Sequence, residues 1–111
     1  MALIITTNEP QRIRDDFERL VSEKRILTWV VDAEGDFTIP KEQWYLHAWM
    51  RPKIINDNHL AFRFISSTRY PVTRGLYGIY HGRLAATLLA HFDTEMDELQ
   101  ITPLMDRDLD V

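Results

Sequence analysis

The sequence predicts an α+β protein, in which an antiparallel sheet of about four to five strands carries two helices on one face. Three observations predict this class. The expected elements follow the order β-α-β-β-β-α-β, two segments have helical hydrophobic spacing, and the connections between residues 26 and 66 are as short as those of hairpins. The order is that of a ferredoxin-like variant with an added strand. We expect one domain over residues 1–104 and a frayed acidic tail over residues 105–111.

The first expected elements are a short strand at residues 3–7 and a helix over residues 8–25. Either Asn8 or Thr7 is suited to cap the helix, and Pro10 falls in the first turn, where its missing N–H costs little. Four apolar residues share one face of this helix, whereas its other residues are almost all charged or polar: Ile13, Phe17, Leu20 and Val21.

The middle of the chain predicts strands at residues 25–31, 44–51 and 59–66, with a turn at Gly35. Residues 52–58 and 66–73 are expected to be loops, although Ile54 and Ile55 could extend a strand. A short edge strand is expected at residues 98–104 and is stopped by Pro103.

Residues 75–92 predict a second helix, capped by Thr73, that contains three glycines. On a helical wheel the bulky residues Leu84, Tyr77, Leu88 and Phe92 gather on one side, and we expect this side to lie on the sheet. A narrow polar wedge holds Arg83, Thr87, Tyr80 and His91. The remaining side is a face of small residues, which are candidates for close helix packing or a dimer contact: Gly75, Gly78, Gly82, Ala85 and Ala86.

Each glycine inside a helix costs about 1 kcal/mol relative to alanine, so this face is expected to have a close neighbour. The neighbour is either the first helix or a second copy of the chain. A phosphate-binding loop is the weaker interpretation, because the spacing G-x-x-G-x-x-x-G places the last glycine well inside the helix. Thr73, Arg74 and the first-turn N–H groups could still hold an anion.

Charge is distributed unevenly along the chain. Residues 41–91 carry seven basic and two acidic side chains, whereas residues 92–111 carry seven acidic and one basic. No carboxylate side chain occurs between Asp57 and Asp93. Such a segment can form an anion-binding surface, unless the acidic parts of the chain fold beside it.

Aromatic and basic residues alternate along the expected strand at residues 44–51 and predict a second, outward sheet face. Side chains of these types can stack on bases and neutralise phosphates, although no RNA-recognition signature is present. The alternative is that the aromatic side chains are covered by the N-terminal strand, the tail or a second subunit. The candidate binding face consists of Tyr45, His47, Trp49, Arg51, Arg63, Arg69 and Arg74.

No residue set points to catalysis or to a metal. The chain has no cysteine, its four histidines do not converge at ligand spacing, and no serine or carboxylate stands in a catalytic motif. We therefore expect no cofactor and no enzymatic activity. With no signal peptide and no apolar run long enough to span a bilayer, a cytoplasmic protein that does not contact membranes is expected.

These observations favour a small protein–protein interaction module that forms a homodimer. The alternative is a protein that binds nucleic acid or another polyanion through the basic and aromatic sheet face. A weaker third interpretation is a small-molecule pocket between the sheet and the helices, lined by Trp44, Phe62, Phe64 and Tyr77.

Overall fold

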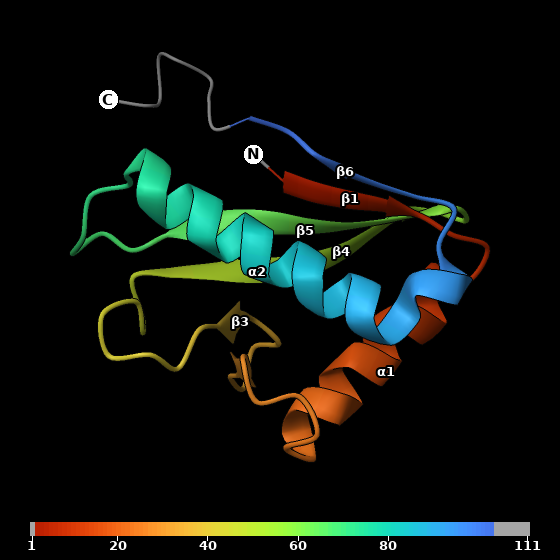
Figure 1. Ribbon diagram of the computed structural model, residues 1–111, viewed down its shortest axis with the longest axis horizontal. Helices are drawn as coiled ribbons and strands as arrows, with labels where there is room; N and C mark the ends of the chain where they lie inside the picture. The colour runs from red at the N-terminus through yellow and green to blue at the C-terminus, as the bar shows by residue number, and fades with distance from the viewer. Residues whose placement is uncertain (1, 104–111) are drawn as a thin grey trace.

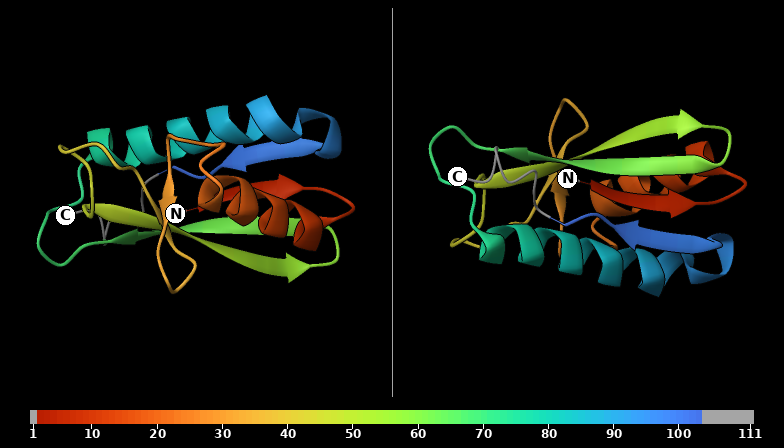
Figure 2. Two further views of the ribbon diagram at one scale, coloured as in Figure 1. Left: turned by 90° about the horizontal axis from the view of Figure 1, so that it is seen from below. Right: turned by 90° about the horizontal axis from the view of Figure 1, so that it is seen from above.

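In the computed structural model, which describes residues 2–103, six antiparallel strands form one sheet, and two α-helices pack on the same face of it (Figures 1 and 2). The elements are β1 (Ala2–Thr6), α1 (Pro10–Ser22), β2 (Val30–Val31), β3 (Phe37–Thr38), β4 (Ala48–Asn56), β5 (His59–Ser66), α2 (Arg74–Phe92), the 3-10 turn η1 (Asp93–Glu95) and β6 (Glu98–Ile101). The predicted tail, residues 105–111, lies outside the described residues.

The strand order, β2-β3-β4-β5-β1-β6, confirms the predicted α+β class. Helix α1 lies in the connection from β1 to β4, two parallel strands that have β5 between them. Helix α2 lies in the connection from β5 to β6, two parallel strands that have β1 between them. Both connections are split βαβ units, as in a ferredoxin-like arrangement. The strand count is higher than expected, because a small β2–β3 hairpin is inserted between α1 and β4 at the edge of the sheet.

Helix α1 is shorter than predicted at both ends. Its N-cap is Glu9 rather than Asn8 or Thr7, and the Thr7 hydroxyl instead accepts a hydrogen bond from the Glu9 N–H at 3.2 Å. Beyond Ser22 the chain turns back, with Lys24 at φ +61°. The expected strand at residues 25–31 is therefore reduced to Val30–Val31, because the preceding residues complete the helix end and cross over the core.

The predicted strand at residues 44–51 begins only at Ala48. Residues 44–47 form tight turns, in which the N–H groups of Trp44 and Tyr45 both donate to the carbonyl of Lys41. Leu46 has φ +61°, which an extended strand does not allow. At its other end β4 continues through Pro52 to Asn56. Proline is tolerated there because the short β3 leaves this part of the outer edge of β4 unpaired.

The core lies between the sheet and the helices and contains a chain of aromatic contacts. Phe17 of α1 packs on Phe37 and Phe62, with ring centroids 4.6 Å and 5.6 Å away. Two residues further along β5 and on the same side of the strand, Phe64 packs on Tyr77 of α2, with ring centroids 5.1 Å apart. Residues two positions apart on a strand point to the same face of the sheet. Because Phe62 contacts α1 and Phe64 contacts α2, both helices lie on that face.

The bulky side of α2 lies on the sheet as predicted, and the side chains of Tyr77, Leu84, Leu88 and Phe92 are buried. Thr73 caps the helix, accepting a hydrogen bond from the Leu76 N–H at 3.0 Å. The expected polar wedge differs, because two of its members, Tyr80 and Thr87, are also buried. Their hydroxyl groups find partners inside the protein, which offsets the cost of burying them.

The hydroxyl of Tyr80 joins α2 to the inserted hairpin. It donates to the carbonyl of Trp44 at 2.6 Å, accepts from the N–H of Ile39 at 3.4 Å, and lies 3.0 Å from the hydroxyl of Thr38. Thr38 in turn donates to the carbonyl of Ala48 and accepts from the N–H of Leu46. This buried network fixes the turns at residues 44–47 against the core.

Replacing Tyr80 by phenylalanine is expected to lower the free energy of unfolding by about 1–3 kcal/mol, because the buried Ile39 N–H loses its acceptor and the Trp44 carbonyl keeps only the His47 N–H as a donor among the described residues. Urea denaturation measures this change. Tyr45→Phe is the matched control, since the Tyr45 hydroxyl makes no hydrogen bond within residues 2–103 and its side chain is exposed. Equal stabilities of the two variants would contradict a supporting role for the network.

Candidate functional site

The small-residue side of α2 faces outward. We call Gly75, Gly78, Gly82, Ala85 and Leu89 the outer stripe, and Ala86 lies beside it. A Cβ atom built on Gly78 or Gly82 would meet nothing within 4 Å. Leu89 is 47% exposed. Helix α1 therefore does not cover this side, and of the two expected neighbours only a second copy of the chain remains as a proposal.

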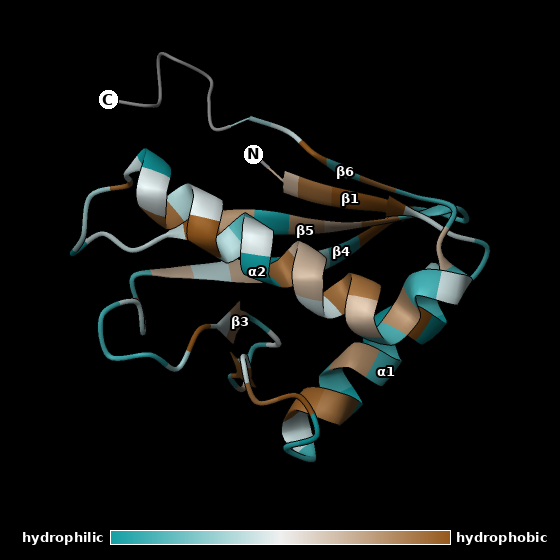
Figure 3. Cartoon of the chain, in the orientation of Figure 1, coloured by the Kyte–Doolittle hydropathy of each residue, from teal (hydrophilic) through white to brown (hydrophobic). Residues whose placement is uncertain are grey.

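The outer stripe has the spacing of a helix-pairing seam. Its members follow one another at intervals of three, four, three and four residues, the pattern by which two helices meet along a line. No charged residue belongs to the stripe. Figure 3 shows white and brown residues along much of the visible side of α2, interrupted by teal at its start and near its middle.

The seven residues of the candidate binding face do not form a single platform. Trp49 and Arg51 of β4 and Arg63 of β5 share the sheet face away from the helices, and Arg51 lies directly opposite Arg63. However, Arg51 makes a two-pronged ion pair with the buried carboxylate of Asp36, at 2.8 and 2.7 Å. This ion pair raises the pKa of Arg51 and compensates its charge. The basic character of this face is weaker than the sequence suggests.

His47, Arg69 and Arg74 lie near the start of α2 instead. The His47 ring stacks on Tyr70 with centroids 3.7 Å apart and planes 11° apart, and the Arg69 guanidinium lies 5.8 Å from the Tyr70 ring centroid. Arg74 is the first, exposed residue of α2. The sequence did not indicate Tyr70 as a partner of His47, because the two residues are brought together only by the ends of β4 and β5.

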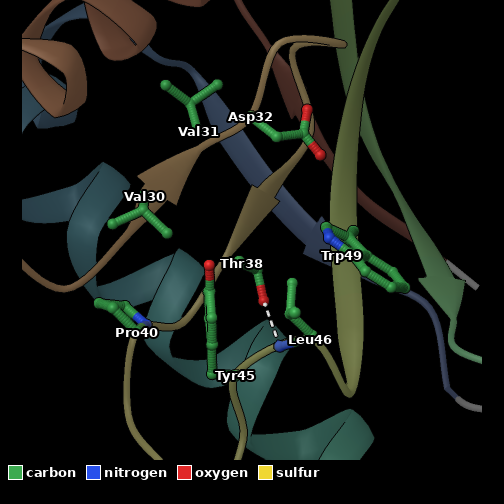
Figure 4. Close-up of a pocket in the computed structure, with 8 residues that line it drawn as sticks. All are labelled: Val30, Val31, Asp32, Thr38, Pro40, Tyr45, Leu46 and Trp49. Carbon is green, nitrogen blue, oxygen red and sulfur yellow. Dashed lines mark hydrogen bonds between the residues drawn. The ribbon is translucent and has the colours of Figure 1, made fainter. Parts of the chain in front are cut away.

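Tyr45 belongs to neither group and is 48% exposed, so the N-terminal strand does not cover it. Its ring enters a hollow of about 310 Å³ beside β3, which we call the β3 hollow (Figure 4). The sequence did not predict this hollow, because its local patterns indicate a simple turn at Gly35 and a strand at residues 44–51. It is lined by Val30, Val31, Asp32, Thr38, Pro40, Tyr45, Leu46 and Trp49.

The proposed pocket between sheet and helices is not open. Phe62, Phe64 and Tyr77 are buried core residues, and only Trp44 borders a cavity. Among residues 2–103 no three His, Asp or Glu side chains come together in a way that could hold a metal ion. Neither α-helix of the described chain is sufficiently long and apolar to cross a membrane.

His81 is a buried titratable group that the sequence did not distinguish. Its side chain is 2% exposed and stacks on Tyr77 at 3.8 Å. The Nδ1–H donates to the carbonyl of Tyr77 at 2.8 Å, and the buried Nε2 has no partner among the described residues. Burial lowers the pKa of His81 below its ordinary value of about 6.5, because the charged ring would lose its hydration.

No protein family, curated protein or solved structure was found to match this chain.

The His81 geometry predicts a pH-dependent stability. Because the folded state disfavours protonation of His81, the unfolded chain binds more protons than the folded chain as the pH falls below about 6.5. The free energy of unfolding is therefore highest above that pH and decreases as the pH falls toward the lowered pKa of His81. His81→Phe is expected to make the free energy of unfolding less dependent on pH between neutral and mildly acidic solution. Urea denaturation at several pH values measures this dependence. His91→Gln, at an exposed position of the same helix, should retain the wild-type dependence, and equal slopes for all three chains would contradict the assignment.

Proposed function

We propose that this protein is a non-enzymatic interaction module that pairs with a second copy of itself through the outer stripe of α2. The observation that carries the proposal is the open space outside Gly78 and Gly82. Two interior glycines cost the helix about 2 kcal/mol relative to alanine, and no close contact within the described chain offsets that cost. A second helix that approaches this side closely would use the missing side chains.

The order of residues along the stripe favours an antiparallel pair related by a two-fold axis. With Gly82 on the axis, residues at equal distances on either side of it face each other across the interface. Gly75 then faces Leu89 of the partner subunit, Gly78 faces Ala86 of the partner subunit, and Ile79 faces Ala85 of the partner subunit. Each larger side chain meets a smaller residue, which is the complementarity that close helix packing requires.

Charge supports the same direction. In an antiparallel pair the dipoles of the two helices oppose each other, and the positive start of one helix lies near the end of the other. Arg74 is the first residue of α2, whereas Asp93 follows the helix directly. The basic end of one copy therefore meets the acidic end of the other.

The alternative, a polyanion-binding sheet face, has less support. Its seven residues divide between the sheet and the start of α2, and Arg51 is compensated by Asp36. Arg63 and Lys53 do remain exposed on that face without an ion pair among residues 2–103. Two isolated cations on an open sheet provide little of the multiple phosphate contact on which such binding depends.

Replacing Gly82 by leucine is expected to abolish self-association, because the side chain would lie on the two-fold axis. The fold of the single chain should be preserved, since the site is open in the monomer. Sedimentation equilibrium across the micromolar range measures the association, and circular dichroism checks the fold. Gln100→Leu adds the same side chain to an exposed position of β6 and should leave the dimer intact.

Gly82→Ala separates helix stability from pairing. Alanine should raise the unfolding free energy of the dilute monomer by about 1 kcal/mol while weakening the dimer. A wild-type chain that sediments as a monomer at every concentration, or a Gly82→Leu chain that still forms the dimer, would overturn the proposal.

A further inference from the structure

The start of α2 and the turns at residues 44–47 enclose a second cavity, of about 410 Å³, which we call the α2 cavity. Its volume falls within the range of about 300–1,000 Å³ that is usual for small-molecule sites. The wall is mostly apolar, with aromatic rings on two sides. The main lining residues are Trp44, His47, Tyr70, Thr73, Gly75 and Ile79.

Two guanidinium groups lie beside the α2 cavity, each over an aromatic ring that lines it, although neither guanidinium lines the cavity itself. Arg83 lies 4.9 Å from the ring centroid of Trp44, and Arg69 lies 5.8 Å from that of Tyr70. Neither has a carboxylate oxygen within 4 Å among residues 2–103. The chain also has no acidic side chain between Asp57 and Asp93. The positive charge beside this apolar cavity is therefore not compensated by a carboxylate of residues 2–103.

Polar groups capable of donating hydrogen bonds lie on the same wall. The ring nitrogens of His47 make no hydrogen bond with the described part of the chain, because the ring is held by stacking on Tyr70. The Thr73 oxygen accepts from the Leu76 N–H, which leaves its own hydrogen free to be donated. Aromatic walls, uncompensated guanidinium groups and free donors are the features that recognise a flat ring bearing an anionic group.

We propose that the α2 cavity binds a small ligand in which an aromatic ring is joined to a phosphate or carboxylate. The ring lies against the aromatic wall formed by Trp44 and Tyr70, and the anionic group lies near Arg83 and Arg69. The site shares Gly75 and Ile79 with the proposed pairing surface, but its aromatic walls and its two arginines lie outside that surface and in the same chain, so it goes beyond the pairing proposed above. A nucleoside monophosphate and a phosphorylated tyrosine both contain an aromatic ring joined to a phosphate. The experiment below compares the binding of these two ligands.

The three tryptophans allow the site to be located by NMR. Phenyl phosphate is titrated into the ¹⁵N-labelled chain, and the indole N–H signals of Trp29, Trp44 and Trp49 are followed. The Trp44 signal is expected to shift, whereas the signal of Trp29, which is buried and bonded to Thr87, and that of Trp49, on the sheet face, should not. Inorganic phosphate tests the need for the ring, and phenol tests the need for the charge. Adenosine monophosphate and phosphotyrosine then show which source fits better.

Arg83→Gln should weaken phenyl phosphate binding about tenfold, as expected for the loss of one charge-assisted contact. Arg63→Gln removes an equally unpaired arginine from the sheet face and should leave binding unchanged. The Gly82→Leu chain should still bind, which separates this site from self-association.

Three results would overturn the proposal: no shift of the Trp44 signal, equal binding of inorganic phosphate or of phenol, or equal loss of binding in both arginine variants.

Discussion

The hydroxyl group of Tyr80 is the contact on which the functional surfaces of this protein depend. The inserted segment between α1 and β4 has only two two-residue strands, too little regular structure to hold itself in place. One buried hydroxyl from α2 reaches the carbonyl of Trp44 and lies beside Thr38, and it thereby fixes both ends of the turns at residues 44–47. Burial raises the pKa of Tyr80, so the group remains a proton donor. The β3 hollow and the α2 cavity are both shaped by the turns that it holds.

Helix α2 serves three surfaces at once, which explains its unusual composition. Its bulky side completes the core, its flank at Gly75 and Ile79 borders the α2 cavity, and its outer stripe is uncovered at Gly78 and Gly82 within residues 2–103. A helix with one function could carry charged residues on its outer side, as α1 does with its network of surface ion pairs. Helix α2 has almost no position left for them. Its uniform apolar character therefore reflects the number of its contacts rather than deep burial.

The sequence predicted the parts of the fold that depend on local patterns. The amphipathic spacing of α1, the Thr73 cap and the alternation of Leu60, Phe62 and Phe64 were sufficient to place both helices and β5. It failed at residues 44–47, where the alternation of Trp44, Tyr45 and His47 resembles a strand. There the hydroxyl of Tyr80, 36 positions away, donates a hydrogen bond to the Trp44 carbonyl and holds a turn, and a contact between residues so far apart cannot be read from the local sequence. The α2 cavity and the His47–Tyr70 stack were missed for the same reason, whereas the small-residue stripe was found because it lies on a single helix.

The position of β1 has a consequence for how the chain reaches this structure. β1 is hydrogen-bonded to β5 on one side and to β6 on the other, and the backbone of Ala2 pairs with Thr102, 100 residues away. Contacts of such long range are slow to form, because the loop entropy must be lost before they stabilise anything. The apolar segment ALIIT is synthesised long before residues 98–101, which form its last partner strand. Until residues 98–101 are made, one edge of β1 has no partner strand even after β5 has paired with the other edge, and an unpaired strand edge is prone to aggregation.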